Sequence, residues 1–160
     1  MTQDIRSRKV VLVAHCVLNQ NSRVSGLAIY PALVYEIVEV LTKHNVGIIQ
    51  LPCPELTYAG LTRASQTKEQ YDTPKFRKHC RQIAESLAKQ IQEYMQNNVR
   101  VLAILGIKGS PSCGVTETSG VLIEELKSEL EKRDISIPFH GLEFKKISAD
   151  IDWLEKKVKT

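Results

Sequence analysis

The chain has 160 residues, a formal net charge of +4 and 25% charged residues. This ordinary globular composition predicts one domain over residues 1–160. No stretch approaches the roughly 18 apolar residues of a membrane span, and the polar N-terminus does not resemble a signal peptide, so we expect a cytoplasmic protein that binds no membrane. Basic and acidic residues are mixed, which favours a solvated surface over a nucleic-acid patch.

Four short apolar runs predict strands, at residues 10–14, 46–51, 101–107 and 135–139. Apolar residues at helical spacing predict helices at residues 30–44, 74–97, 121–130 and 148–158. Pro31 suits a first helical turn, Pro74 is expected to open the second helix, and Ser148 is expected to cap the last one. The polar segments 15–26 and 55–73 are expected to be irregular, and the second is long enough to predict a functional loop.

The alternation of strands and helices predicts an α/β fold, with a mostly parallel sheet covered by helices on both faces. In such sheets the binding crevice lies beyond the carboxyl ends of the strands. Cys16, Cys53 and Cys113 each follow one of the first three strands. We therefore expect these three cysteines to lie near one another at one edge of the sheet.

The three cysteines do not have the local spacing of zinc ribbons or ferredoxins, so only the fold can bring them together. An all-sulfur ligand set with one open position favours iron–sulfur or zinc over hard cations. The equal alternative is three unrelated buried or loop thiols. Cys80 falls in the middle of a predicted helix and is expected to be a core or surface thiol outside the site.

Several polar residues near these cysteines have two interpretations. Asn19, Arg63 and Ser112 are candidates for substrate binding, and the alternatives are turn residues or a solvated arginine. Glu55 and Ser110 are candidates for chemistry, and the alternatives are a loop carboxylate near the next helix for Glu55 and, favoured on the residues alone, a turn residue bonded to its own backbone for Ser110. His15 is expected to be packed or hydrogen-bonded rather than a ligand.

Two motifs resemble the thiouracil desulfurase (desulfidase) family. They are Cys53-Pro54-Glu55, followed by Gly60 and Arg63, and the string Gly-Ser-Pro-Ser-Cys-Gly at residues 109–114. The similarity spans residues 10 to about 120. The first motif departs from the family, because this chain has His-Cys-Val where the family usually has Ala-Cys-Leu with a glycine soon after. The chain therefore resembles a divergent branch, which leaves its substrate open.

The resemblance implies a single-domain, Rossmann-like three-layer sandwich with a [4Fe–4S] cluster on Cys16, Cys53 and Cys113, one iron being left free. It also implies acid–base catalysis by Glu55 and a catalytic role for Ser110. The implied reaction is the non-redox removal of sulfur, as hydrosulfide, from a small thiolated nucleobase or nucleoside. A tRNA substrate is not indicated by the charge pattern, and the sequence does not indicate the oligomeric state.

Two alternatives remain at this point. The first is an iron–sulfur or zinc sensor without catalysis. The second is a cysteine phosphatase or an arsenate-reductase-like enzyme, in which Cys16 and Arg23 would form a Cys-x5-Arg loop after the first strand. Here six residues rather than five separate the two side chains, and this reading leaves Cys53 and Cys113 without a role.

Overall fold

A parallel β-sheet forms the centre of the computed structural model, which describes residues 3–116 and 118–160. Its strand order is β2-β1-β3-β4, and the strands are β1 Lys9–Ala14, β2 Gly47–Leu51, β3 Arg100–Ile107 and β4 Phe139–Leu142. The two inner strands, β1 and β3, end in fully apolar, buried runs, as expected for strands covered on both faces. The expectation of a polar N-terminus without a signal peptide falls partly on residues 1–2, which lie outside the described residues.

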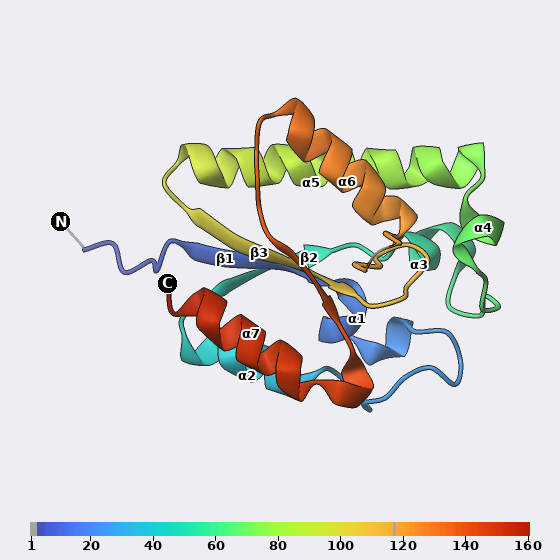
Figure 1. Cartoon of the computed structure of the whole chain (residues 1–160), viewed down its shortest axis with the longest axis horizontal. Helices are drawn as coiled ribbons and strands as arrows, with labels where there is room; N and C mark the ends of the chain where they lie inside the picture. The colour runs from blue at the N-terminus through green and yellow to red at the C-terminus, as the bar shows by residue number, and fades with distance from the viewer. Residues whose placement is uncertain (1–2, 117) are drawn as a thin grey trace.

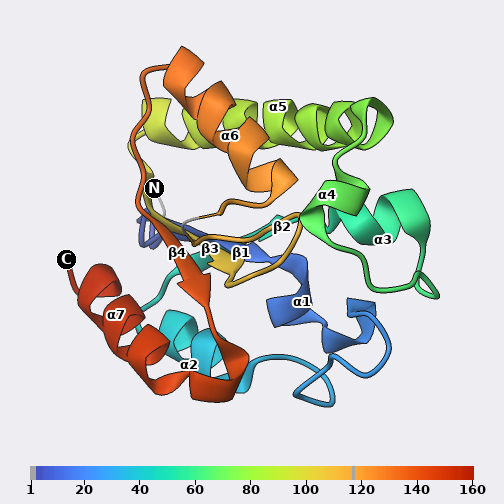
Figure 2. The same cartoon turned by 45° about the vertical axis from the view of Figure 1, so that its right-hand side comes forward.

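Helices cover both faces of this sheet. Figures 1 and 2 show α5 (Pro74–Gln96) and α6 (Val121–Lys132) on one face, and α2 (Tyr35–Lys43) and α7 (Ser148–Val158) on the other. Each helix turns an apolar stripe inward; in α5 the stripe includes Phe76, Leu87 and Ile91. The structure thus has the expected α/β, Rossmann-like three-layer architecture. In the described part of the chain, no helix is both long and apolar enough to cross a bilayer.

The order of the strands creates a crevice. The chain runs from β1 outward to β2 and then returns to the opposite side of β1 to form β3. Ligands in open α/β sheets bind beyond the carboxyl ends of the strands where the order reverses in this way. The loops that follow β1 and β3 therefore border the favoured site.

The two segments predicted to be irregular contain short helices, so that prediction is wrong in part. Residues 15–26 contain α1 (His15–Leu18) and a 3-10 turn (Gln20–Ser22), and residues 55–73 overlap α3 (Pro54–Ala59) and contain α4 (Lys68–Tyr71). Local hydrogen bonds explain the starts of α3 and α4. Cys53 caps α3 through its sulfur, which accepts from the backbone N–H of Leu56, and Thr67 and Gln70 form a reciprocal capping box on α4.

The predicted start of the first long helix is also wrong. The helix begins at Tyr35, not near residue 30, and Pro31 lies in a bend before it. The backbone of this bend is bonded to the segment after β1. The Gln20 N–H donates to the carbonyl of Ala32 at 2.6 Å, and the Val34 N–H donates to the carbonyl of Val17 at 2.8 Å. These bonds tie residues 32–34 to the segment after β1 and precede the start of the helix at Tyr35.

Two further predictions near the C-terminus need correction. The fourth strand is Phe139–Leu142 instead of residues 135–139, because its ladder on β3 starts where the Pro138 carbonyl accepts from the Ile104 N–H. Ser148 begins α7 but its side chain makes no capping hydrogen bond. In contrast, Pro74 opens α5 as expected, and the Thr73 hydroxyl accepts from the Phe76 N–H at 3.2 Å.

Candidate active site

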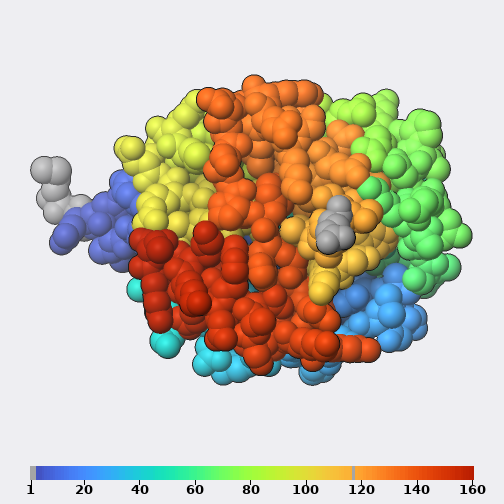
Figure 3. All heavy atoms as spheres, viewed as in Figure 1, coloured from blue at the N-terminus to red at the C-terminus, as the bar shows by residue number. Residues whose placement is uncertain are grey.

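Three cysteines lie at the carboxyl edge of the sheet. Cys16 lies in α1 directly after β1, Cys53 caps α3 after β2, and Cys113 lies in the loop after β3. All three line one pocket of about 240 Å³. Figure 3 shows the loop after β3 (amber) at the surface, between the α3–α4 region in green and the segment after α1 in blue. The tertiary structure thus joins three segments that are far apart in the sequence.

The pocket environment favours the neutral form of these thiols. Burial raises the pKa of Cys16 and Cys53, and it raises the pKa of Cys113 to about 11. The negative charges that the neighbouring thiolates would carry raise the Cys16 and Cys113 pKa values further. A metal that binds these cysteines would have to displace their protons.

The same arrangement gives no support to a cysteine-phosphatase reading. A nucleophilic cysteine of that class has a lowered pKa in a loop of phosphate-facing amides, whereas the pKa of Cys16 is raised. The residues after it form α1 and a 3-10 turn rather than an open anion-binding loop. Arg23 lines the same pocket as Cys16, and its guanidinium lies over the ring of Phe144, 5.1 Å from the ring centre.

Among the described residues, no three His, Cys, Asp or Glu side chains are grouped closely enough to hold one metal ion. The three cysteines share a pocket without converging on a single point. Thiolates are the ligands that both iron–sulfur clusters and zinc take, and Cys16, Cys53 and Cys113 are the residues of this pocket that could supply them.

Glu55 lies in the same pocket as the thiols, with a hydrogen bond at one carboxylate oxygen and an ion-pair contact at the other. Its side chain is 10% exposed, and it lines the same pocket. The Ser112 hydroxyl donates to Oε2 at 2.5 Å, and Arg63 Nε lies 3.5 Å from Oε1. Pro54 at the first position of α3 and the Cys53 cap place the carboxylate at the start of that helix.

Arg63 joins three parts of the site. Its Nη1 donates to the carbonyl of Gly60 at 3.0 Å, and its Nη2 donates to the carbonyl of Ser22 at 2.9 Å. The side chain is only 5% exposed, although it lines the pocket. The guanidinium thereby connects the loop after α3 to the 3-10 turn after Cys16.

Ser110 organises the loop that carries Cys113. Its Oγ accepts from the Cys113 N–H at 3.2 Å and from the Cys113 thiol at 3.3 Å, and it lines the pocket. The loop is packed tightly on its own backbone: a side chain at Gly114 would collide with the carbonyl of Ser110, and one at Gly120 would collide with the carbonyl of Ser112. Only glycine allows this close approach at these two positions.

The predicted site residues are therefore not all in one place. Cys16, Cys53, Cys113, Glu55, Arg63 and Ser110 line the pocket. Ser112 is fully buried behind it. Asn19 lies outside the pocket, is exposed, and accepts from the backbone N–H of Asn21 as a turn residue does. A substrate contact by Asn19 remains a prediction.

Other predictions about thiols and histidines can be placed as well. Cys80 is completely buried in α5 within the core, away from the pocket. His15 is hydrogen-bonded to the side chain of Gln50 through Nδ1, which fits the structural role expected for it. The remaining pocket wall, including Val24, Leu27 and Lys108, was not identified from the sequence, because no motif or spacing distinguishes it.

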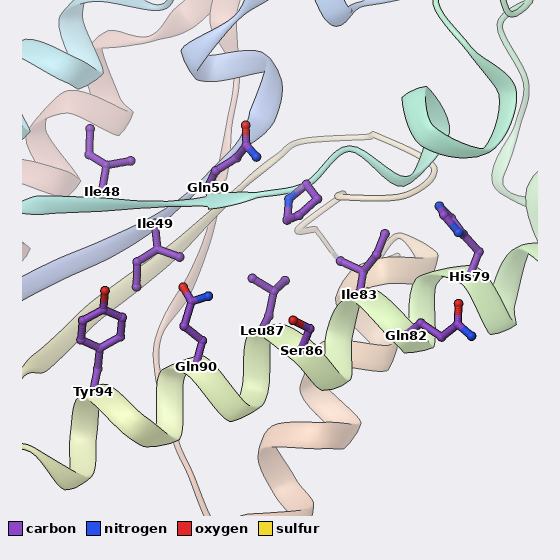
Figure 4. Close-up of a pocket in the computed structure, with 11 residues that line it drawn as sticks. Ile48, Ile49, Gln50, His79, Gln82, Ile83, Ser86, Leu87, Gln90 and Tyr94 are labelled. Carbon is purple, nitrogen blue, oxygen red and sulfur yellow. The ribbon is translucent and has the colours of Figure 1, made fainter.

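A larger hollow of about 620 Å³ lies between β2 and α5 (Figure 4). Its wall combines the side-chain amides of Gln82 and Gln90 with apolar side chains such as Ile83 and Leu87. None of the described cysteines lines it. The smaller thiol-lined pocket is therefore the better candidate for chemistry.

Comparisons with known proteins give the family of this chain. Residues 9–128 match the family described as "Putative 2-thiouracil desulfurase". An uncharacterized protein of Methanocaldococcus jannaschii is 40% identical over 159 residues, which cover 97% of this chain and 100% of that protein. No solved structure gives a match. The matched region contains all three pocket cysteines and Glu55, and the chain belongs to this 2-thiouracil desulfurase family.

Proposed function

We propose that this protein is a desulfidase that removes sulfur as hydrosulfide from the thiocarbonyl group of a small thiolated nucleobase or nucleoside. The observation that carries the proposal is the pocket in which Cys16, Cys53 and Cys113 surround the space next to Glu55. Membership of the family supports the reaction class. The volume of about 240 Å³ is below the 300–1,000 Å³ or so of pockets for drug-sized ligands and favours a small substrate.

The cofactor that we propose is a [4Fe–4S] cluster on Cys16, Cys53 and Cys113. When bound through three cysteines, such a cluster supplies an iron with a free coordination position, which acts as a Lewis acid toward the thiocarbonyl sulfur. The protein contributes the three thiolates and the walls of the pocket. Burial of the site also limits the access of bulk water to the substrate.

Glu55 is the residue that transfers protons in this reaction. The overall reaction exchanges C=S and water for C=O and hydrogen sulfide, and it requires no net electron transfer. Glu55 takes a proton from the attacking water and returns it to the leaving sulfur or the ring, provided that the carboxylate lies within hydrogen-bond reach. Ser110 orients the water: its Oγ already accepts from the Cys113 N–H, so its own O–H is available to donate into the pocket.

The test combines metal content with turnover. Anaerobically reconstituted protein is expected to be brown, to hold about four iron per chain, and to release sulfide from 2-thiouracil or a thiouridine. Glu55→Gln is expected to keep the iron and sulfide content and the absorption spectrum while sulfide release falls at least about a hundredfold, the usual contribution of a general acid–base group. Glu69→Gln, at an exposed position in α4, is the matched control.

Three outcomes decide between the candidate functions. Protein that stays colourless after anaerobic reconstitution contradicts the cluster. A full cluster without turnover on any thiolated base, nucleoside or tRNA favours the sensor function. Unchanged turnover in Glu55→Gln removes this carboxylate from the mechanism.

A further inference from the structure

Two of the residues that the sequence assigned to substrate binding contact Glu55 instead. Ser112 is 0% exposed, and it does not line the pocket. Its hydroxyl donates to Glu55 Oε2 at 2.5 Å. A substrate in the pocket cannot reach this hydroxyl unless the loop after β3 rearranges.

That loop is poorly able to rearrange. The carbonyl of Ser112 accepts from the Leu122 N–H at 2.9 Å, and the carbonyl of Pro111 accepts from the Val121 N–H at 3.0 Å. These bonds satisfy the first N–H groups of α6, which would otherwise lack partners. Ser112 is thus fixed by the helix behind it.

Arg63 is similarly occupied by the protein itself. Both terminal nitrogens donate to backbone carbonyls, those of Gly60 and Ser22, and Nε lies 3.5 Å from Glu55 Oε1. Nε is buried and makes no hydrogen bond within the described residues, so its contact with Glu55 is an ion pair. The guanidinium borders the pocket, but its three nitrogens are turned toward the chain.

We propose that Ser112 and Arg63 are positioning residues that hold the Glu55 carboxylate in one orientation, one at each oxygen. This inference rests on the proposed desulfidase function. It replaces the substrate-binding roles with an indirect role: the two side chains act through Glu55. An oriented carboxylate matters because a displacement of about 1 Å at the reacting groups can cost about a hundredfold in rate.

A positioning role and a substrate-binding role predict different kinetics. Loss of a substrate contact raises KM, whereas loss of orientation lowers kcat. In reconstituted protein with unchanged iron content, Ser112→Ala and Arg63→Lys are each expected to lower kcat for sulfide release about tenfold to a hundredfold, with KM within about twofold of the wild type. Ser112→Thr, which keeps the hydroxyl, is expected to recover most of the kcat.

Thr42→Ala is the control. The Thr42 hydroxyl donates to the carbonyl of Val38 in α2 at 2.8 Å, and Thr42 does not line the pocket. The change therefore removes one side-chain hydroxyl and its hydrogen bond away from Glu55. The kcat of this variant is expected to stay within about twofold of the wild type.

A crystal structure of cluster-free Ser112→Ala separates this inference from the proposed function. The Glu55 carboxylate is expected to leave the orientation that it has in the cluster-free wild type. A raised KM with normal kcat in both variants overturns the inference, and so does an unmoved carboxylate. If Ser112→Ala does not fold, Arg63→Lys and its structure decide. If the wild type has no desulfidase activity, the carboxylate position still tests the positioning role.

Discussion

The four cysteines of the chain differ in what surrounds them. Cys113 faces the pocket and donates its thiol to Ser110 Oγ, whereas Cys80 lies among core side chains of α5. Burial raises the pKa of both, to about 11 for Cys113 and about 12 for Cys80. Burial alone therefore does not distinguish a ligand from a core thiol. The position of Cys113 beyond a strand end is the reason why we propose it, and not Cys80, as a ligand.

This difference predicts opposite results for two serine variants. Cys113→Ser is expected to lower the iron content after anaerobic reconstitution, because one ligand is lost. Cys80→Ser is expected to leave iron unchanged but to lower the free energy of unfolding by about 1–3 kcal/mol, since a hydroxyl is then buried in an apolar site. Iron analysis and denaturant unfolding check the two effects, with Cys80→Ala to separate polarity from volume. Equal iron loss in both serine variants would contradict the ligand assignment.

The helices of this fold differ in how they begin. The Thr73 hydroxyl accepts from the Phe76 N–H and caps α5, the longest helix described. The side chain of Ser148, at the start of α7, makes no such bond. Both residues are exposed. A comparison of alanine variants at the two positions therefore measures how much the capping hydrogen bond of Thr73 contributes to stability.

Thr73→Ala is accordingly expected to destabilise the protein by about 1 kcal/mol, or about 3 °C in Tm for a chain of this length. Ser148→Ala is expected to leave Tm within about 1 °C of the wild type, as for surface changes that break no contact. Thermal unfolding of the cluster-free protein measures both. An equal decrease in Tm in the two variants would mean that the hydrogen bond of Thr73 does not stabilise the protein.

Charged side chains connect α4, α5 and α6 over the sheet. Arg77 donates to Asp72 at 2.8 Å, to Glu124 at 2.9 Å and to Glu125 at 3.0 Å, and Lys68 pairs with Glu124. Hydrogen bonding to Arg77 lowers the pKa of Asp72. For Glu124, burial acts in the opposite direction, and the bonds from Lys68 and Arg77 outweigh it, so its pKa is also lowered.

Lowered carboxyl pKa values predict acid sensitivity of the whole molecule. The stabilisation is complete above the ordinary carboxyl values, 3.8 for Asp72 and 4.5 for Glu124, and it is lost as the pH falls through the lower folded-state values. We expect the free energy of unfolding of the cluster-free protein to decrease below about pH 4.5, and the decrease to be smaller in Arg77→Gln. Urea unfolding between pH 3 and 6 measures the slope. If the slope is the same in Arg77→Gln, the ion pairs of Arg77 are not the cause of the acid sensitivity.

Much of the architecture follows from local patterns. The apolar runs of β1, β2 and β3 and the apolar stripe of α5 are read directly, because the side-chain periods of strands and helices are properties of the chain itself. The short helices α3 and α4 were missed although a capping box at Thr67 and Gln70 was visible in the sequence. The start of β4 was misplaced because it depends on which carbonyl faces Ile104 across the sheet.

Local patterns in the chain were enough to predict the α/β class, the strand-end positions of Cys16, Cys53 and Cys113, and the motif around Glu55, because each depends on residues close together in the sequence. The contacts of Ser112 and Arg63 with Glu55, and the place of Asn19 outside the pocket, emerge only in the folded chain. These contacts depend on the packing of α6 against the loop after β3 and on the hydrogen bond from Arg63 to the distant carbonyl of Ser22. No local period or spacing encodes such distances.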